Sequence, residues 1–379
     1  MNRVVMETWG TGLDIMGFLK KVVNDYPAKT EIVVFCPWEF MALSENIRQS
    51  WPDPPDGTPI SIERILKDVQ HYRDQIDQLG SRIIMVDNFD NSTGRLDEWA
   101  AVYDIVLDEH YQWRTVFLQW DISYISSLYD TPYVYHDLQH TFICKNSKSH
   151  NHRCDLMDAL AKFDLLQDNV WSWRLPTYED RPEPWDFKYW TEVKQELPEE
   201  GPMANRDENM SGTEPAGYKN TLIDLVSESN DRAVFITEKT AKPLSTSKPF
   251  VIWGAPGTNL YLEKMGFQLY DELFDYSFDN IQDNADRASE LARQLAELAK
   301  RFDTPQKRQA IMDQLWHKRM HNVRVLCNIG KTLTGMPDIV KHIDKNNMIE
   351  TIFNNTEYHA GQLLARMESL TPPYSKTQE

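Results

Sequence analysis

The segment Phe235-Ile236-Thr237-Glu238-Lys239 combines residue types that can bind an anion. Thr237 is a preferred N-cap residue, so it predicts a short helix whose first turn holds Lys239. A helix N-terminus carries about half a positive charge, which disfavours a lysine by a few tenths of a kcal/mol unless an anion lies beside it. A phosphate group would supply that anion, and Glu238 can accept hydrogen bonds from sugar hydroxyls. The alternative is an ordinary surface lysine.

Arg153 repeats this arrangement earlier in the chain. It follows the apolar residues 142–144 and the polar loop 145–152, and we expect it to open the next helix. The planar guanidinium group of arginine is suited to binding phosphate oxygens with two donors. Two cations at two helix starts, each after an apolar strand, predict a diphosphate site that needs no metal.

The elements that must position these residues alternate along the first half of the chain. Short apolar runs predict strands at residues 3–8, 31–35, 82–86 and 104–107. A helix is expected over residues 13–23, and apolar residues at helical spacing predict another over 62–79, ended by Gly80. Strands separated by helices require crossover connections, which indicates a parallel sheet.

A second series of elements begins near residue 141. Strands are expected at 141–144, 222–226 and 249–253, and helices at 153–163, 282–302 and 305–329. Two such series predict an α/β protein with two Rossmann-like halves, whose ligands bind beyond the carboxyl ends of the strands. We therefore expect an N-terminal domain over 1–138, a second domain over 139–330 and a helical extension over 331–379. Residues 176–215, rich in proline and acidic side chains, predict a mobile insertion or a solvated loop.

The composition excludes several classes of protein. The 379 residues include 58 acidic and 40 basic side chains, a formal net charge of −18, which argues against a nucleic-acid-binding surface. A hydrophobic fraction of 41% excludes a disordered chain. The four cysteines have no paired spacing, and no apolar run reaches the ~18 residues of a membrane helix. We expect a cytoplasmic protein without a membrane partner.

Three segments of the second half together resemble a known family signature. The signature is a strand ending in Glu-Asn, then an aromatic residue, a hydrophobic residue and Thr-Glu-Lys, and finally a strand of the form Pro-Φ-Φ-x-Gly. The matching segments are 225–229 (LVSES), 235–239 (FITEK) and 249–254 (PFVIWG). They resemble the family-10 glycosyltransferases, the α1,3-fucosyltransferases, with their phage-type and bacterial relatives. The resemblance covers roughly residues 139–330.

This resemblance implies a GT-B fold, in which two Rossmann-like domains face each other across a cleft. It implies inverting, metal-independent transfer of a sugar from a nucleoside diphosphate sugar, a GDP-sugar in the family, to a hydroxyl of a glycan or other acceptor. No further cofactor is implied. Arg153 and Lys239 would bind the donor diphosphate. The residues implied at the donor sugar and nucleoside are Glu228, Ser229, Phe235, Thr237 and Glu238.

The chain departs from the signature at two of these positions. Ser229 stands where the family has Asn, and Phe235 where it often has Tyr. Both departures remove hydrogen-bonding groups, so the identity of the donor sugar stays open.

An inverting transfer needs a carboxylate that removes the proton of the acceptor hydroxyl. The family's base follows an apolar strand of the N-terminal domain. Asp87, directly after residues 82–86, fits this position best, with Asp90, Glu39 and Glu109 as alternatives.

Two further groups of residues suggest other roles. Cys144, His150, His152 and Cys154 suggest zinc, but their spacing matches no common zinc motif, and we expect no metal. The tryptophans of the second half either stack on sugar rings or anchor the insertion to the core. They are Trp171, Trp173, Trp185 and Trp190.

Two other functions remain open from the sequence. One is a phage or viral enzyme that glycosylates a modified nucleobase in DNA, against which the net charge of −18 argues. The other is a catalytically silent protein that binds a nucleotide sugar, in which Ser229 and Phe235 would be signs of lost activity.

Overall fold

A computed structural model gives the fold of the protein. The structure describes residues 2–7, 15–36, 62–87, 104–105, 134–146, 150–173, 187–190, 217–229, 231, 234, 236–334 and 361–370. The chain divides into two compact units, one of residues 1–117 and 330–357, the other of residues 118–329 and 358–379. Each unit contains one parallel sheet, so the prediction of an α/β protein is confirmed.

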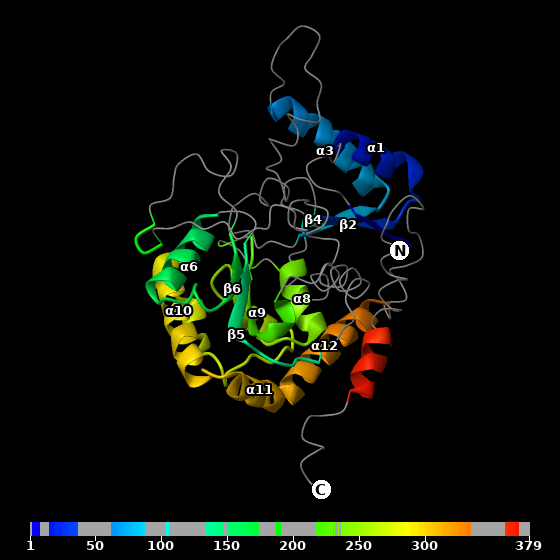
Figure 1. Ribbon diagram of the computed structural model, residues 1–379. Helices are drawn as coiled ribbons and strands as arrows, with labels where there is room; N and C mark the ends of the chain where they lie inside the picture. The colour runs from blue at the N-terminus through cyan, green and yellow to red at the C-terminus, as the bar shows by residue number, and fades with distance from the viewer. Residues whose placement is uncertain are drawn as a thin grey trace, which may run out of the picture. The chain divides into compact units, whose positions relative to one another are not determined.

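The first unit contains a sheet whose strands follow the order of the chain. Its strands are β1 (Asn2–Glu7), β2 (Thr30–Cys36), β3 (Arg82–Asp87) and β4 (Asp104–Ile105), paired in that order and all parallel. The helices α1 (Ile15–Asp25) and α3 (Ile62–Gln78) connect the first three strands and pack against each other (Figure 1). The predicted strands and helices of this half are confirmed to within a few residues.

Gly80 ends α3 as expected. Its φ of +63° lies in the left-handed region that favours glycine, and its N–H donates to the carbonyl of Asp77 at 2.9 Å. The N–H of Ser81 then donates to the carbonyl of Ile76 at 3.1 Å, so the last turn of the helix leads directly into β3.

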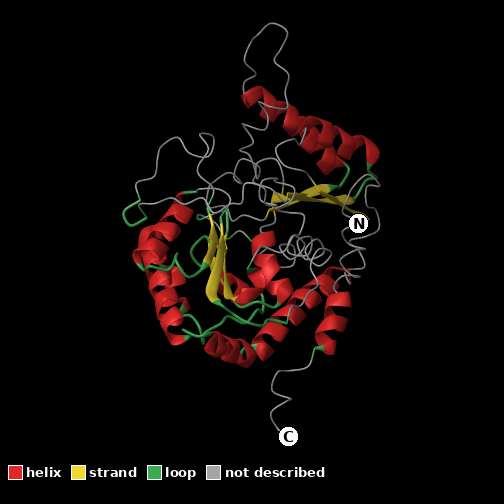
Figure 2. Ribbon diagram, viewed as in Figure 1, coloured by secondary structure: helices red, strands yellow, loops and turns green. Residues whose placement is uncertain are grey.

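The second unit contains a sheet with a different strand order. Its parallel strands are β5 (His140–Lys145), β6 (Val170–Ser172), β7 (Thr221–Ser227) and β8 (Phe250–Trp253), in the spatial order β6-β5-β7-β8. Every residue of β7 is buried, as expected for a strand inside a parallel sheet that is covered on both faces. Figure 2 shows the strands of this sheet between helices.

Helices cover both faces of the second sheet. One face lies under α6 (Asn151–Lys162) and α10 (Asn284–Arg301), which pack against each other, and α8 (Glu238–Thr246) lies on the other face (Figure 1). The remaining helical elements are η3 (Tyr218–Asn220), α9 (Thr258–Lys264), η4 (Tyr276–Asn280), α11 (Pro305–Gln314), α12 (Trp316–Thr334) and a helix over 361–369. Neither β6 nor α9 was expected from the sequence.

The single helix expected over 305–329 is wrong, because the chain turns at Leu315 and forms α11 and α12. The buried guanidinium group of Arg319 donates to the carbonyl of Met312 at 3.2 Å and to that of Ser247 at 2.6 Å. The turn thus lets one arginine bond a carbonyl near the end of α11 and fix the loop before β8. No glycine or proline marks this break in the sequence.

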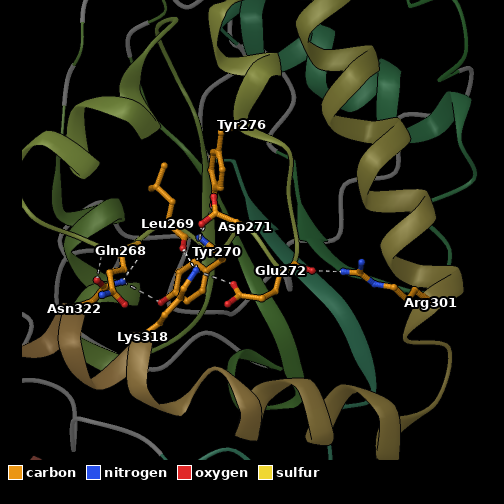
Figure 3. A network of polar contacts seen from close by, with 9 residues as sticks. All are labelled: Gln268, Leu269, Tyr270, Asp271, Glu272, Tyr276, Arg301, Lys318 and Asn322. Atoms are coloured by element: carbon orange, nitrogen blue, oxygen red, sulfur yellow. Dashed lines mark hydrogen bonds and ion pairs between the residues drawn. The ribbon is translucent and has the colours of Figure 1, made fainter.

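A network of polar contacts fixes residues 268–276 against α10 and α12 (Figure 3). The ammonium group of Lys318 donates to the carbonyl of Leu269 at 2.8 Å and to the Glu272 carboxylate at 2.9 Å. The Asn322 side chain accepts from the N–H of Gln268 at 2.7 Å and donates to its carbonyl at 2.9 Å. The network joins the segment between α9 and η4 to α12. Within the described residues, no helix is both long enough and apolar enough to cross a membrane.

Candidate functional site: the carboxyl ends of β5 and β7

The candidate site lies where the strand order of the second sheet reverses. The chain leaves β5 for β6 on one side, and β7 pairs with β5 on the other side. Crossovers of one hand therefore place α6, after β5, and α8, after β7, on opposite faces of the sheet. Such a reversal opens a crevice at the carboxyl ends of the two central strands, and both helices begin at this edge.

Glu228 follows β7 directly and links the beginnings of both helices. It is fully buried, and its carboxylate accepts from the Thr237 N–H at 3.0 Å and from the hydroxyls of Thr237 and Thr240, both at 2.7 Å. Its main-chain carbonyl accepts from Arg153 and His152 of α6. Glu228 thus holds the two helix N-termini at one point of the sheet edge.

Arg153 lies in the first turn of α6, as predicted, although the helix begins two residues earlier, at Asn151. Arg153 is 2% exposed, and its guanidinium group donates to the carbonyls of Glu228 at 3.2 Å and Ser227 at 3.1 Å. The side chain is therefore held against the end of β7 rather than extended into solvent. Its charge remains at the helix N-terminus.

Lys239 lies in the first turn of α8, also as predicted. Thr237 is the N-cap, and its hydroxyl oxygen accepts from the Lys239 N–H at 3.3 Å and from the Lys239 ammonium group at 3.2 Å. The same hydroxyl donates to Glu228, whose carbonyl accepts from Arg153. The two predicted phosphate-binding cations therefore converge on Glu228, one through its main chain and the other through a threonine that its carboxylate binds.

An external anion is not the only negative charge that can stabilise Lys239 at the N-terminus of α8. The carboxylate of Glu228 already supplies a negative charge at the N-terminus of α8, which stabilises the lysine there. Arg153, Lys239 and Glu228 together still carry one net positive charge, and the positive ends of two helix dipoles add to it. This arrangement can bind a phosphate or diphosphate group.

His152 also lies at this point of the sheet edge, although the sequence suggested it only as a metal ligand. Its Nε2 lies 2.9 Å from the carbonyl of Glu228 and must carry the hydrogen, because a carbonyl only accepts. Burial lowers the pKa of His152 to about 4, so the ring is neutral at neutral pH. Its Nδ1 lies 3.9 Å from the Asp231 carboxylate. The sequence did indicate that His152 lies close to the start of a helix that follows a strand, and this position could have marked it as a site residue.

The suggested zinc ligands are used otherwise. Cys144 and Cys154 are fully buried, and burial raises the pKa of the Cys144 thiol to about 12. The Cys144 sulfur accepts from the amide of Asn146 at 3.3 Å. Among the described residues, no group of three or more His, Cys, Asp or Glu side chains is arranged to hold a metal ion.

The remaining predicted site residues are only partly described. Ser229 is half-buried directly after Glu228, and Glu238 begins α8, although its side chain is outside the described part of the structure. Asp87 is the last residue of β3 in the first unit, again without a described side chain. The predicted residues that lie wholly outside the described ranges are Glu39, Asp90, Glu109 and Phe235.

The tryptophans of the second unit anchor a segment of the insertion. Trp171, Trp173 and Trp190 are each less than 10% exposed, and both Trp171 and Trp173 contact Trp190 edge to face. The Asp158 carboxylate of α6 accepts from the N–H groups of residues 188–190. These three side chains therefore fit the expectation that they anchor the insertion to the core, rather than the expectation that they stack on a sugar. Trp185 and the rest of residues 176–215 lie outside the described part.

Comparison of this chain with protein-family models, with curated proteins and with solved structures found no match.

Proposed function

We propose that this protein is a glycosyltransferase of the GT-B type that transfers a sugar from a nucleoside diphosphate sugar to an acceptor hydroxyl, with inversion. The observation that carries the proposal is the convergence of Arg153 and Lys239 on Glu228, at the reversal of a parallel sheet. The motif resemblance of residues 225–254, which include Glu228 and Lys239, also supports it.

The chemistry that this site would supply is stabilisation of the leaving diphosphate. Bond cleavage at the sugar leaves negative charge on the phosphate oxygens, and positive groups fixed in advance stabilise that charge without reorganising. Arg153 is buried and held by two carbonyls, and Lys239 is held by the Thr237 hydroxyl, so both charges are preorganised. Glu228 would act by positioning both helices, since its carboxylate oxygens already accept three hydrogen bonds.

The base that takes the acceptor proton would come from the first unit. We assign it to Asp87 because this residue ends β3 and stands at the carboxyl edge of that sheet. Asp90, Glu39 and Glu109 are the alternatives. Ser229, Phe235, Thr237 and Glu238 would surround the nucleoside and sugar of the donor.

The first test measures nucleotide binding by calorimetry, after a thermal-shift panel of nucleoside diphosphates and their sugars has named the preferred base. Lys239→Ala should weaken binding of that nucleoside diphosphate by about 2 kcal/mol, because a charge-assisted contact is lost. Lys20→Ala, at an exposed position on α1, is the matched control and should bind normally. Unchanged affinity of the Lys239 variant would contradict the proposal.

The second candidate is a catalytically silent protein that binds a nucleotide sugar. The enclosure of Glu228 favours it, because a carboxylate expected at the donor instead bonds α8. Release of nucleoside diphosphate from the preferred sugar nucleotide, abolished by Asp87→Asn with unchanged nucleotide affinity, would exclude the silent protein. Binding without transfer to any acceptor or to water would support it.

A further inference from the structure

Two hydrogen-bond acceptors lie next to each other at the beginning of α6. The Nδ1 atom of His152 lies 3.9 Å from Oδ2 of Asp231, which is too far for a hydrogen bond. The Nε2 atom of His152 carries the ring hydrogen, because it lies 2.9 Å from the carbonyl of Glu228, so Nδ1 presents a lone pair. An ionised carboxylate also only accepts. Neither of the two facing atoms can therefore donate to the other.

The Asp231 carboxylate is fixed from the side of α10. Asn284, the first residue of α10, donates its side-chain amide to Oδ2 of Asp231 at 2.8 Å. The amide oxygen of Asn284 accepts from Arg287 at 2.7 Å, and the Arg287 guanidinium group lies 4.5 Å from the centre of the Trp253 ring. Both Arg287 and Trp253 are buried. A chain of contacts that ends in the core thus holds the carboxylate in place.

Asp231 and His152 retain acceptors that a ligand can use. A carboxylate has about four lone-pair sites, whereas Asn284 is the only donor to Asp231 among the described residues. The Asp231 side chain is 27% exposed, so a ligand can reach it from solvent. The His152 side chain is 2% exposed, and a buried acceptor without a donor costs free energy. The space beside Nδ1 therefore favours a group that donates hydrogen bonds.

This pair of acceptors lies beside the proposed diphosphate site. The carbonyl of Glu228 accepts from Nε2 of His152 and also from Nε of Arg153, so the imidazole ring and the guanidinium group meet at one oxygen atom. Both side chains come from the first turn of α6. A nucleotide carries its ribose next to its phosphates. A diphosphate bound at Arg153 would therefore bring neighbouring sugar hydroxyls close to His152 and Asp231.

The enclosure of Glu228 leaves the binding of hydroxyls to another carboxylate. Nucleotide-binding folds of this kind commonly use an acidic side chain to accept from ribose hydroxyls. The carboxylate of Glu228 is fully buried and already accepts from the N–H of Thr237 and from the hydroxyls of Thr237 and Thr240. Asp231 follows three residues later in the chain and is partly exposed. It is thus the better placed of the two to contact a ligand.

We propose that His152 and Asp231 together bind the two neighbouring hydroxyls of a vicinal diol in the sugar nucleotide, with Nδ1 accepting from one hydroxyl and the carboxylate from the other. This inference rests on the proposed function and names residues that select its ligand. Ribose and the transferred sugar can both offer such a diol, and the experiment distinguishes them.

The experiment first compares ligands that differ by one hydroxyl. Calorimetry at neutral pH measures binding of the wild-type protein to UDP, GDP, ADP and CDP, and then of the best-bound nucleotide against its 2′-deoxy and 3′-deoxy forms. If the diol is that of ribose, at least one deoxy form should bind about tenfold more weakly, because a charge-assisted hydrogen bond is lost. If the diol is that of the transferred sugar, the deoxy forms should bind equally well.

An isosteric variant of Asp231 locates the effect. For a ribose diol, Asp231→Asn should lower the affinity for the ribonucleotide about tenfold and remove its advantage over the deoxy form. For a diol of the transferred sugar, the variant should bind the nucleoside diphosphate normally and lose the affinity gained from UDP to UDP-glucose or from GDP to GDP-mannose. Asp283→Asn, at the exposed N-cap of α10, is the matched control. It removes the same charge, keeps a good capping residue and should leave every affinity unchanged.

Two results would overturn this inference alone. One is equal binding of the ribonucleotide and both deoxy forms, together with an unchanged contribution of the sugar in Asp231→Asn, which would show that only water occupies the space beside Nδ1 of His152. The other is a hydroxyl preference that survives in Asp231→Asn. Absence of binding by every nucleotide and sugar nucleotide would overturn the proposed function and this inference with it.

Discussion

The two sheets of this protein differ in strand order, and this difference decides how the helices that follow the strands are placed at the edge of each sheet. In the first sheet the order β1-β2-β3-β4 runs in one direction, and α1 packs against α3. In the second sheet, β6 and β7 lie on opposite sides of β5. Helices of opposite faces therefore begin at one edge of the second sheet, whereas the described strands of the first show no such reversal.

Each sheet contains a buried glutamate, and the two glutamates bind different kinds of partner. Glu31 of β2 is 2% exposed and pairs with Arg82, its register partner on β3, whose side chain is half exposed. Glu228 is fully buried and accepts from two threonines of α8, while its main chain accepts from α6. Glu31 joins neighbouring strands, whereas Glu228 joins the beginnings of two helices.

The largest effect should come from removing these carboxylates. Glu228→Ala leaves a buried N–H and two hydroxyls without an acceptor, so we expect a loss of about 3 kcal/mol in the free energy of unfolding. Glu31→Ala should cost about 1 kcal/mol, because Arg82 can be solvated. Calorimetric unfolding measures both, and titration with the preferred nucleoside diphosphate should show weakened binding only for Glu228→Ala. Equal losses of nucleotide affinity in both variants would break the comparison.

A pH-dependent effect should follow from His152. Its pKa of about 4 in the folded protein lies below the ordinary value of 6.5, so the unfolded chain binds the proton more readily. The associated stability is present above pH 6.5 and is lost as the pH falls toward 4. We expect a decrease of about 2 kcal/mol between pH 7 and pH 5 from this residue.

The measurement compares unfolding of the wild type and His152→Gln across this pH range. Buried acids such as Asp224 and Asp279 titrate in both proteins, so the difference between the two curves isolates His152. His71→Gln on the exposed face of α3 is the matched control in the first unit. Parallel curves for wild type and His152→Gln would show that the ring is not held neutral by burial.

The smallest effect should come from substituting the threonine that caps a helix N-terminus, and it should differ between α11 and α8. Thr304 caps α11 by accepting from the Lys307 N–H at 3.3 Å, the same distance at which Thr237 accepts from Lys239. Thr304→Ala should cost about 1 kcal/mol in unfolding and leave nucleotide binding unchanged. Thr237→Ala should cost more and also weaken binding, because its hydroxyl joins Lys239 to Glu228. Identical effects of the two substitutions would argue against a site at α8.

Local sequence patterns were sufficient to predict most helices and strands and the positions of Arg153 and Lys239 at helix starts. The apolar spacing of residues 62–79 and Gly80 fixed α3, and Thr237 marked the start of α8. The short β6 was not predicted because three residues are too few to show an alternating pattern. The break at Leu315 was not predicted because it goes with a contact between Arg319 and Ser247, which are far apart in the sequence. The burial of the tryptophans, too, depends on residues far apart in the chain.

By itself, the sequence determined that Arg153 and Lys239 open helices after apolar strands, because helix signals are local. Whether those helices begin at one point depended on strand order, which no local pattern encodes. The tertiary structure decided that β5 and β7 are neighbours and thereby made Glu228 the link between the two helices. A carboxylate expected to touch a ligand is instead enclosed, because the buried N–H and hydroxyl groups at the start of α8 require an acceptor.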